Sequence, residues 1–199
     1  MPASSKFLDG PDRAPLPGQK SFLKDGPGMD VRRPSDEPGA EQRRDCIGID
    51  PGASGGIAVI KSNGEVLLHS IGGSTDKQTC KFLKFVANSP AFAVVEQNTG
   101  YVGGAGNPGS AMFKFGVSTG KLLGCLTALD IPFSQETPRA WQKVLGIPPR
   151  KKTESKSQFK RRLRQRAEQL FPKVAGITLA TCDAVLIAEF NRRKREGTL

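Results

Sequence analysis

Three short apolar segments lie close together in the chain and are separated only by turns. Residues 46–50 and 56–61 flank a Pro- and Gly-containing turn at 51–55, and residues 66–70 follow an Asn-Gly pair at 63–64. Asn-Gly supplies the positive backbone angles that a two-residue hairpin connection requires. Segments this short and this closely joined are typical of an antiparallel meander. The pattern therefore favours folds that begin with three such strands.

Helical and strand patterns alternate after the meander. Residues 76–87 have helical spacing, with Cys80, Leu83 and Val86 on one face. The other predicted elements are strands at 92–96 and 131–135 and helices at 110–129, 138–145, 155–170 and 183–195. This order is that of the RNase H-like fold, an α/β fold in which helices flank a mixed five-stranded sheet. Its central first strand pairs in parallel with the fourth, through a crossover that residues 76–87 would form.

The start of the chain differs from the rest in composition. Residues 1–44 are rich in Pro, Gly, Asp and charge, and they lack a periodic apolar pattern. Such a segment buries too little apolar surface to offset its chain entropy. We therefore expect a disordered tail at 1–44 and one folded domain at 45–199.

Several classes of protein are disfavoured by composition. No stretch approaches the roughly 18 consecutive apolar residues of a membrane-spanning helix, and the start has no signal-peptide core. The four cysteines are too widely separated for a zinc site, and each lies in an apolar run. Free, buried thiols are typical of a reducing compartment. We expect a cytoplasmic protein with no membrane partner and no small-molecule cofactor.

The positive charge of the chain is concentrated in its last third. The formal net charge is +11, yet residues 1–45 hold eight basic and eight acidic residues. Residues 139–173 hold twelve basic residues and only two acids. A run of positive charge with few acids, within the predicted folded domain, indicates a surface that binds a polyanion, and nucleic acid is the first candidate. The residues expected to contact DNA phosphates are Arg150, Lys151, Lys152, Lys156, Lys160, Arg161, Arg162, Arg164 and Arg166.

Three acids lie where apolar elements end or begin. Asp50 ends the first predicted strand, Glu96 ends the fourth, and Asp183 opens the last helix. Each alone is equally well explained as a cap or a turn residue. A carboxylate after several buried residues is costly unless it is paired or binds a cation. If the two strands are neighbours, the three acids form an oxygen-ligand pocket for Mg²⁺, which predicts catalytic metal ligands at Asp50, Glu96 and Asp183.

At this point the sequence resembles the RuvC-like Holliday-junction resolvases of the RNase H-like superfamily. The resemblance is carried by residues 47–56 (IGIDPGASGG), 94–97 (VVEQ), 112–116 (MFKFG), 138–143 (PRAWQK) and 183–189 (DAVLIAE). It implies that residues 45–199 are a nuclease domain and that the protein is a homodimer. The homodimer would nick two strands of a four-way DNA junction symmetrically. Each active site would use two ions, Mg²⁺ or Mn²⁺. The chain departs from the family at Ala180, where many resolvases carry a further metal ligand.

Some interpretations stay open at this stage. Phe113 and Phe115 either stack on bases at the DNA branch point or belong to the core. Glycines at 116, 120 and 124 line one face of the helix predicted at 110–129, and they pack either on the chain's own sheet or on a second subunit. Ala180 also leaves room for a catalytically weak junction-binding protein. An actin-like ATPase fragment is a further alternative, because such folds share the Asp-containing strand and its Gly-rich turn.

Overall fold

A computed structural model of the chain describes residues 44–97 and 108–198. The tail predicted at 1–44 lies almost entirely outside the described residues, as do residues 98–107. The elements follow in the order β1 (Asp45–Asp50), β2 (Gly56–Ile60), β3 (Val66–Ser70), α1 (Asp76–Val86), β4 (Ala91–Glu96), α2 (Pro108–Ala128), β5 (Phe133–Glu136), α3 (Pro138–Val144), α4 (Lys156–Leu170) and α5 (Cys182–Glu196).

The described strands form one mixed sheet in the order β3-β2-β1-β4-β5. β1 pairs with β2, and β2 with β3, in antiparallel fashion. β1 pairs with β4, and β4 with β5, in parallel. This is the strand order and direction of the RNase H-like fold, so the predicted fold class is confirmed.

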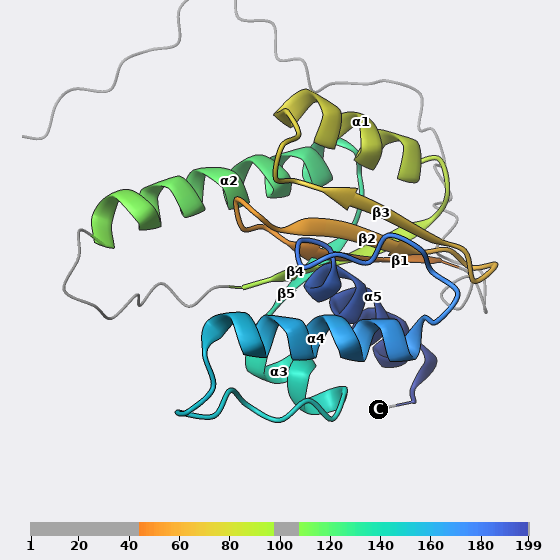
Figure 1. The fold of residues 1–199 in the computed structure, drawn as a ribbon. Coiled ribbons are helices and arrows are strands. Elements are labelled where there is room, and N and C mark those ends of the chain that lie inside the picture. Colours follow the sequence, from red (N-terminus) through yellow and green to blue (C-terminus); the bar gives the residue numbers. More distant parts are fainter. Residues whose placement is uncertain (1–43, 98–107, 199) are drawn as a thin grey trace, which may run out of the picture. The chain divides into compact units, whose positions relative to one another are not determined.

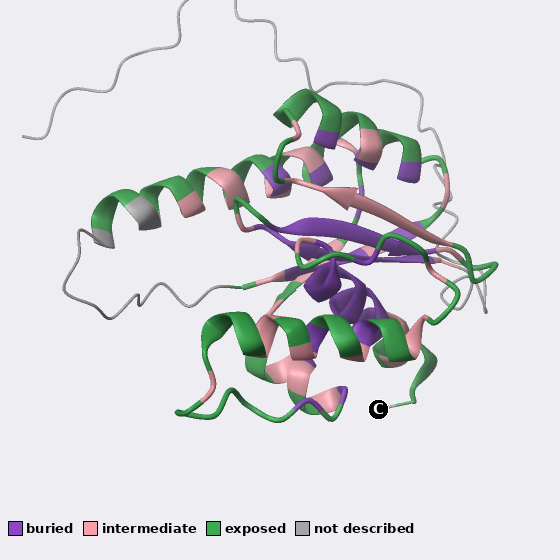
Figure 2. Cartoon of the chain, in the orientation of Figure 1, coloured by how far each residue is buried: buried purple, intermediate pink, exposed green. Residues whose placement is uncertain are grey.

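Helices cover both faces of the sheet (Figure 1). Successive strand residues point to opposite faces, and the two apolar cores divide accordingly. Ile47 and Ile49 of β1 belong to the core beneath α1 and α2. Cys46 of β1 and Val94 of β4 belong to the core beneath α3, α4 and α5. The buried residues lie mainly in β1, β2, β4 and α5, while the outer helices expose one side to solvent (Figure 2).

Helix α5 lies directly on the two central strands. A Cβ atom at Gly48 would stand 2.2 Å from the carbonyl oxygen of Ala184 and 2.2 Å from the backbone nitrogen of Ala188, so only glycine fits. Further along α5, the Asn191 side chain donates hydrogen bonds to the carbonyls of Ile47 at 3.0 Å and Phe92 at 2.8 Å. Glycine thus permits the close approach, and the amide fixes the helix to β1 and β4 together.

The predicted inward face of α1 is partly wrong. Thr79, Leu83 and Val86 are the buried residues of this helix, whereas Cys80 is exposed. Thr79 takes the place of Cys80 on the buried face because it lies beneath β3, where its Oγ1 is 3.1 Å from His69 Nε2. His69 also stacks on Phe82, with ring centroids 4.9 Å apart.

No described helix combines the length and apolar composition that a membrane crossing requires.

Candidate active site

Asp50 is fixed by the turn that follows β1. Its Oδ1 accepts a hydrogen bond from the backbone of Gly52 at 3.1 Å. The turn closes with a bond from the Gly55 nitrogen to the Gly52 carbonyl, and a side chain at Gly55 would collide with the Asp50 carbonyl at 2.1 Å. Ser118 of α2 donates to the Pro51 carbonyl at 3.1 Å. The glycine-containing segment thus supports Asp50, which is buried as a residue.

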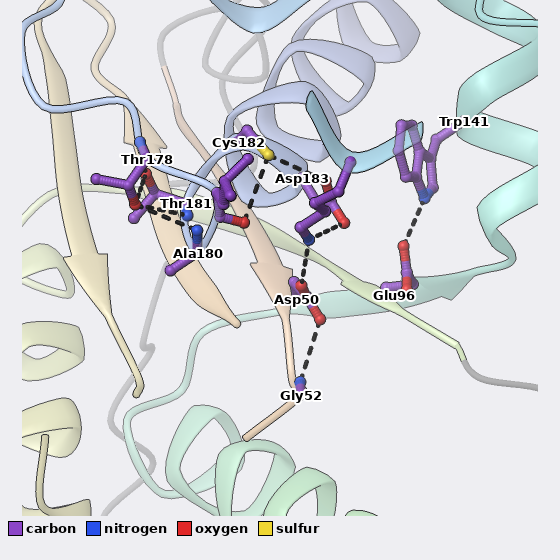
Figure 3. Close-up of polar contacts among 11 residues, drawn as sticks. Asp50, Gly52, Glu96, Trp141, Thr178, Ala180, Thr181, Cys182 and Asp183 are labelled. Atoms are coloured by element: carbon purple, nitrogen blue, oxygen red, sulfur yellow. Dashed lines mark hydrogen bonds and ion pairs between the residues drawn. The ribbon is translucent and has the colours of Figure 1, made fainter. Parts of the chain in front are cut away.

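Glu96 lies beside Asp50 at the same edge of the sheet. The parallel ladder of β1 and β4 ends at the pair Ile49 and Val95, one residue before each acid. Because side chains alternate, Asp50 and Glu96 both point to the face covered by α3, α4 and α5. The buried indole of Trp141 donates to Glu96 Oε2 at 3.0 Å (Figure 3). Burial, with the charges of Asp50 and Asp183, raises the pKa of Glu96 to about 8.

Asp183 enters the site from the first turn of α5. A reciprocal pair of threonines forms the turn before it: the Thr178 nitrogen donates to Thr181 Oγ1 at 3.0 Å, and the Thr181 nitrogen donates to Thr178 Oγ1 at 3.3 Å (Figure 3). A carboxylate in a first helical turn is favoured by the helix dipole. Asp183 is 8% exposed, and its Oδ1 accepts from the Cys182 thiol at 3.3 Å.

Ala180 packs within this turn rather than facing the acids as a ligand. Its carbonyl oxygen would stand 2.9 Å from a Cβ at Gly56, the first residue of β2. Its nitrogen donates to Thr178 Oγ1 at 3.2 Å. Where many resolvases carry a further metal ligand, this chain therefore has an alanine whose backbone packs tightly against the start of β2.

Lys160 of α4 supplies a positive charge between two of the acids. Its Nζ lies 2.5 Å from Asp183 Oδ2 and 3.6 Å from Asp50 Oδ2. Burial works to lower the pKa of Lys160, but the charges of Asp183 and Asp50 outweigh it and the pKa is raised. Burial and the charge of Asp183 also raise the pKa of Asp50, against the effect of Lys160. The sequence placed Lys160 among the phosphate contacts, and its salt bridges in the structure are with these acids.

The three acids suit a hard divalent cation by the chemistry of their donors. All are carboxylates, the ligands that Mg²⁺ prefers, and two of them already share one positive charge. Among residues 44–97 and 108–198, no three His, Cys, Asp or Glu side chains stand together with the spacing of metal ligands. Glu96 is directed to Trp141, so it would have to rotate in order to join Asp50 and Asp183 on one ion.

The predicted DNA contacts of the basic block fall into two groups. Some are engaged within the protein: Arg162 pairs with Glu154 at 3.0 Å and donates to the carbonyls of Pro148 and Pro149. Arg150, Arg164 and Arg166 likewise donate to protein acceptors. The exposed cations with no described side-chain ion pair are Lys151, Lys152, Lys156 and Arg161.

The two aromatic candidates on α2 differ in exposure. Phe113 is 73% exposed, which excludes a place in the described core, and Phe115 is half-buried. No described atom lies within 4 Å of a Cβ built at Gly116, Gly120 or Gly124. The alternative that these glycines pack on the chain's own sheet is therefore wrong.

Sequence reasoning gave no role to Trp141 and did not foresee the ion pairs of Lys160 with Asp50 and Asp183. Trp141 is the only tryptophan in the chain, and an indole can only donate. A tryptophan expected in the core buries an N–H group that needs an acceptor. That requirement was the feature of the sequence from which an acidic partner of Trp141 could have been inferred. Lys160 carried no such signal, because it is one cation among twelve in a basic stretch.

Comparison with known proteins gives a limited result. No family model matches the chain, and no curated protein matches it. Among solved structures the chain is similar to Thermus thermophilus RuvC, with 17% identity over 76% of this chain and 96% of that chain and a TM-score of 0.46. It is also similar to T. thermophilus RuvC in complex with Holliday junction substrate, with 18% identity, coverage of 78% and 97%, and a TM-score of 0.49.

Proposed function

We propose that this chain is a metal-dependent endonuclease that hydrolyses phosphodiester bonds in branched DNA, in the manner of a RuvC-like Holliday-junction resolvase. One observation carries the proposal. Asp50, Glu96 and Asp183 come from β1, β4 and α5, and all three lie on the same face at the same sheet edge, coupled through their charges. Such an arrangement is costly for folding alone, because like charges in a partly buried site oppose ionisation.

Asp50 and Asp183 would hold a divalent ion, Mg²⁺ or Mn²⁺, and Glu96 would complete the ligand set. Two such ions, when bound, activate a water molecule and stabilise the leaving oxygen in phosphodiester hydrolysis. The Gly52 nitrogen holds one oxygen of Asp50 in place. The Trp141 indole donates to Oε2 of Glu96, and rotation of the Glu96 side chain would bring its carboxylate to the ion.

Exposed cations near the site would position the DNA. Lys156 and Arg161 lie on α4, the helix that carries Lys160 into the acidic site, and Lys151 and Lys152 lie in the segment before it. Contacts from these side chains to phosphates fix the register of a nucleic acid without reading its sequence. The proposed substrate is therefore recognised by backbone charge and by branch geometry.

We further propose that the active form is a homodimer joined through α2. The outward face of this helix carries exposed Phe113 and Val117 and the open glycines at 116, 120 and 124. Glycine costs about 1 kcal/mol in a helix interior relative to alanine, so three in register favour close approach of another backbone. A two-fold dimer presents two equivalent sites to two symmetry-related strands.

The proposal is tested by cleavage of a labelled four-way junction against a linear duplex of the same sequence, with Mg²⁺ or Mn²⁺ and with a chelator. Asp50→Asn, Glu96→Gln and Asp183→Asn should each abolish cleavage, while junction binding stays intact or tightens because a negative charge near phosphate is lost. The matched control is Glu136→Gln. Glu136 stands in register with Glu96 on β5, but its carboxylate pairs with Lys194 at 2.6 Å.

Near-normal turnover in one acid variant would remove that residue from the metal site. An equal loss in the Glu136 variant would show that the effect lies in the fold rather than in the site. Binding without cleavage by the wild-type chain would favour a junction-binding protein instead. ATP binding would favour the actin-like alternative, although the described strands form a single five-stranded sheet.

A further inference from the structure

Among the described residues, Lys160 is the cation that pairs with Asp50 and Asp183, and it comes from a helix that does not depend on it for attachment. α4 begins with a capping box formed by Ser155 and Gln158, and it buries Leu163 and Ala167 against the core beneath the sheet. The Lys160 stem extends from this anchored helix, and its ammonium ends beside Asp183 and Asp50. The ammonium can therefore leave the acids without releasing the helix.

The exposure of the three groups is unequal. The side chain of Lys160 is 31% exposed, whereas those of Asp50 and Asp183 are 13% and 12% exposed. The side chain of Lys160 is thus more accessible to water than the two carboxylates with which it pairs. A lysine side chain is a point charge on a flexible four-carbon stem, with no fixed geometry to lose on moving.

We propose that Lys160 is the resident cation of the metal-free site and that a divalent ion binds by displacing it. This inference deepens the proposed function and rests on it for the identity of the ion. In the metal-free protein the ammonium offsets the repulsion between Asp50 and Asp183. When a divalent ion binds, the ammonium leaves the two carboxylates and lies at the solvent side of the site, where a DNA phosphate would meet it.

Lys160 therefore has two opposite effects on the protein. It stabilises the folded chain without metal, and it weakens metal binding because its ion pairs must be broken first. A residue that merely braced the fold would produce the first effect without the second.

The test compares Lys160→Met with Lys156→Met, the same change one helical turn earlier at an exposed lysine with no described ion pair. Mn²⁺ binding is measured by calorimetry without DNA, and melting temperature is measured with chelator and with saturating Mn²⁺. For Lys160→Met we expect a lower melting temperature in chelator and a dissociation constant for Mn²⁺ about tenfold lower, equivalent to about 1.4 kcal/mol. For Lys156→Met we expect neither change.

A second measurement uses the wild-type chain, in case the variant fails to fold. Reductive methylation followed by mass spectrometry compares the reactivity of Lys160 with that of Lys156. Lys160 should be protected in chelator and should become more reactive when Mn²⁺ is added, while Lys156 stays constant. Unchanged or weaker Mn²⁺ binding by Lys160→Met, or Lys160 reactivity that ignores Mn²⁺, would overturn the inference. Neither readout involves DNA, so failure of the nuclease proposal appears separately in the cleavage assay.

Discussion

A methyl group at position 48 is expected to destabilise the protein more than any exposed substitution of the same size. Gly48 lies in the middle of β1, where α5 passes over it at backbone contact distance. The atoms that a Cβ would meet belong to the backbone at Ala184, Ile187 and Ala188. A side chain could rotate away from such a collision, but helix backbone cannot.

The size of the effect follows from the distances. Two of the three contacts would be 2.2 Å, and ordinary contact begins at 3.4 Å, so α5 must retreat by more than about 1 Å. Over-packing a core costs about 1–3 kcal/mol, occasionally more, and rigid backbone on both sides places Gly48→Ala at about 3 kcal/mol. In a domain of about 150 residues this lowers the melting temperature by about 6–12 °C. The retreat also moves Asp183 away from Asp50, so metal binding should weaken together with stability.

Chemical denaturation and thermal unfolding followed by circular dichroism measure this effect directly. The matched control is Gly109→Ala in the first turn of α2, where no described atom lies within 4 Å of the added Cβ. Alanine is the better helix former by about 1 kcal/mol, so the control should be neutral or slightly more stable. A Gly48→Ala protein within about 1 kcal/mol of wild type would refute the claim that α5 is seated on β1 at contact distance.

Four further predictions concern the surface and the fold. Junction binding should weaken with salt at a slope of roughly −0.9 per neutralised phosphate, and the slope should flatten when alanine replaces Lys152, Lys156 and Arg161. Arg162→Ala should instead leave the slope unchanged and cost about 1 kcal/mol of stability, because its partners lie within the protein. His69 has a pKa lowered by partial burial, so its contribution to stability is present above its ordinary pKa of 6.5 and is lost as the pH falls below it; His69→Gln should lack this dependence. Gly120→Leu should give a folded monomer that binds DNA weakly and no longer makes paired nicks, as judged by light scattering and junction cleavage.

Each of these predictions has a result that contradicts it. An unchanged salt slope in the triple variant would mean that those three cations face away from DNA. A flattened slope in Arg162→Ala would show that its ion pair opens on binding. Equal pH dependence in wild type and His69→Gln would assign the effect to carboxylates. A monomer mass for the wild-type chain, with and without junction DNA, would exclude the dimer.

The order of strands and helices was predictable because turns and apolar periodicity are local properties of the chain. The Asn-Gly turn and the short strands on either side of it define β2 and β3 within about one residue. Pro138 marks the start of α3, where proline at the first helical position loses no hydrogen bond. The face of α1 was misjudged at Cys80, because the burial of Thr79 depends on β3 rather than on α1 itself.

The candidate site was predictable only in part. A carboxylate at the end of an apolar strand is visible in sequence, which is why Asp50 and Glu96 could be proposed as neighbours. The partners of charged side chains are not visible in this way. Lys160 and Arg162 are two residues apart in the same basic run, yet one pairs with Asp183 and the other with Glu154. That difference arises from the packing of α4 on α5, which no local pattern encodes.

The seating of α5 on β1 and β4 has a consequence for synthesis of the protein on the ribosome. Glu96 leaves the ribosome before Asp183 by roughly 4–17 s at the usual pace of about 5–20 residues per second, and Asp50 leaves it earlier still. Until α5 emerges, Gly48 has no helix above it, and Asn191 is not there to bridge the carbonyls of Ile47 and Phe92. The nascent chain at that stage holds two of the three acids and lacks the helix that carries the third. One late docking event therefore both closes the core on that face of the sheet and completes the candidate site.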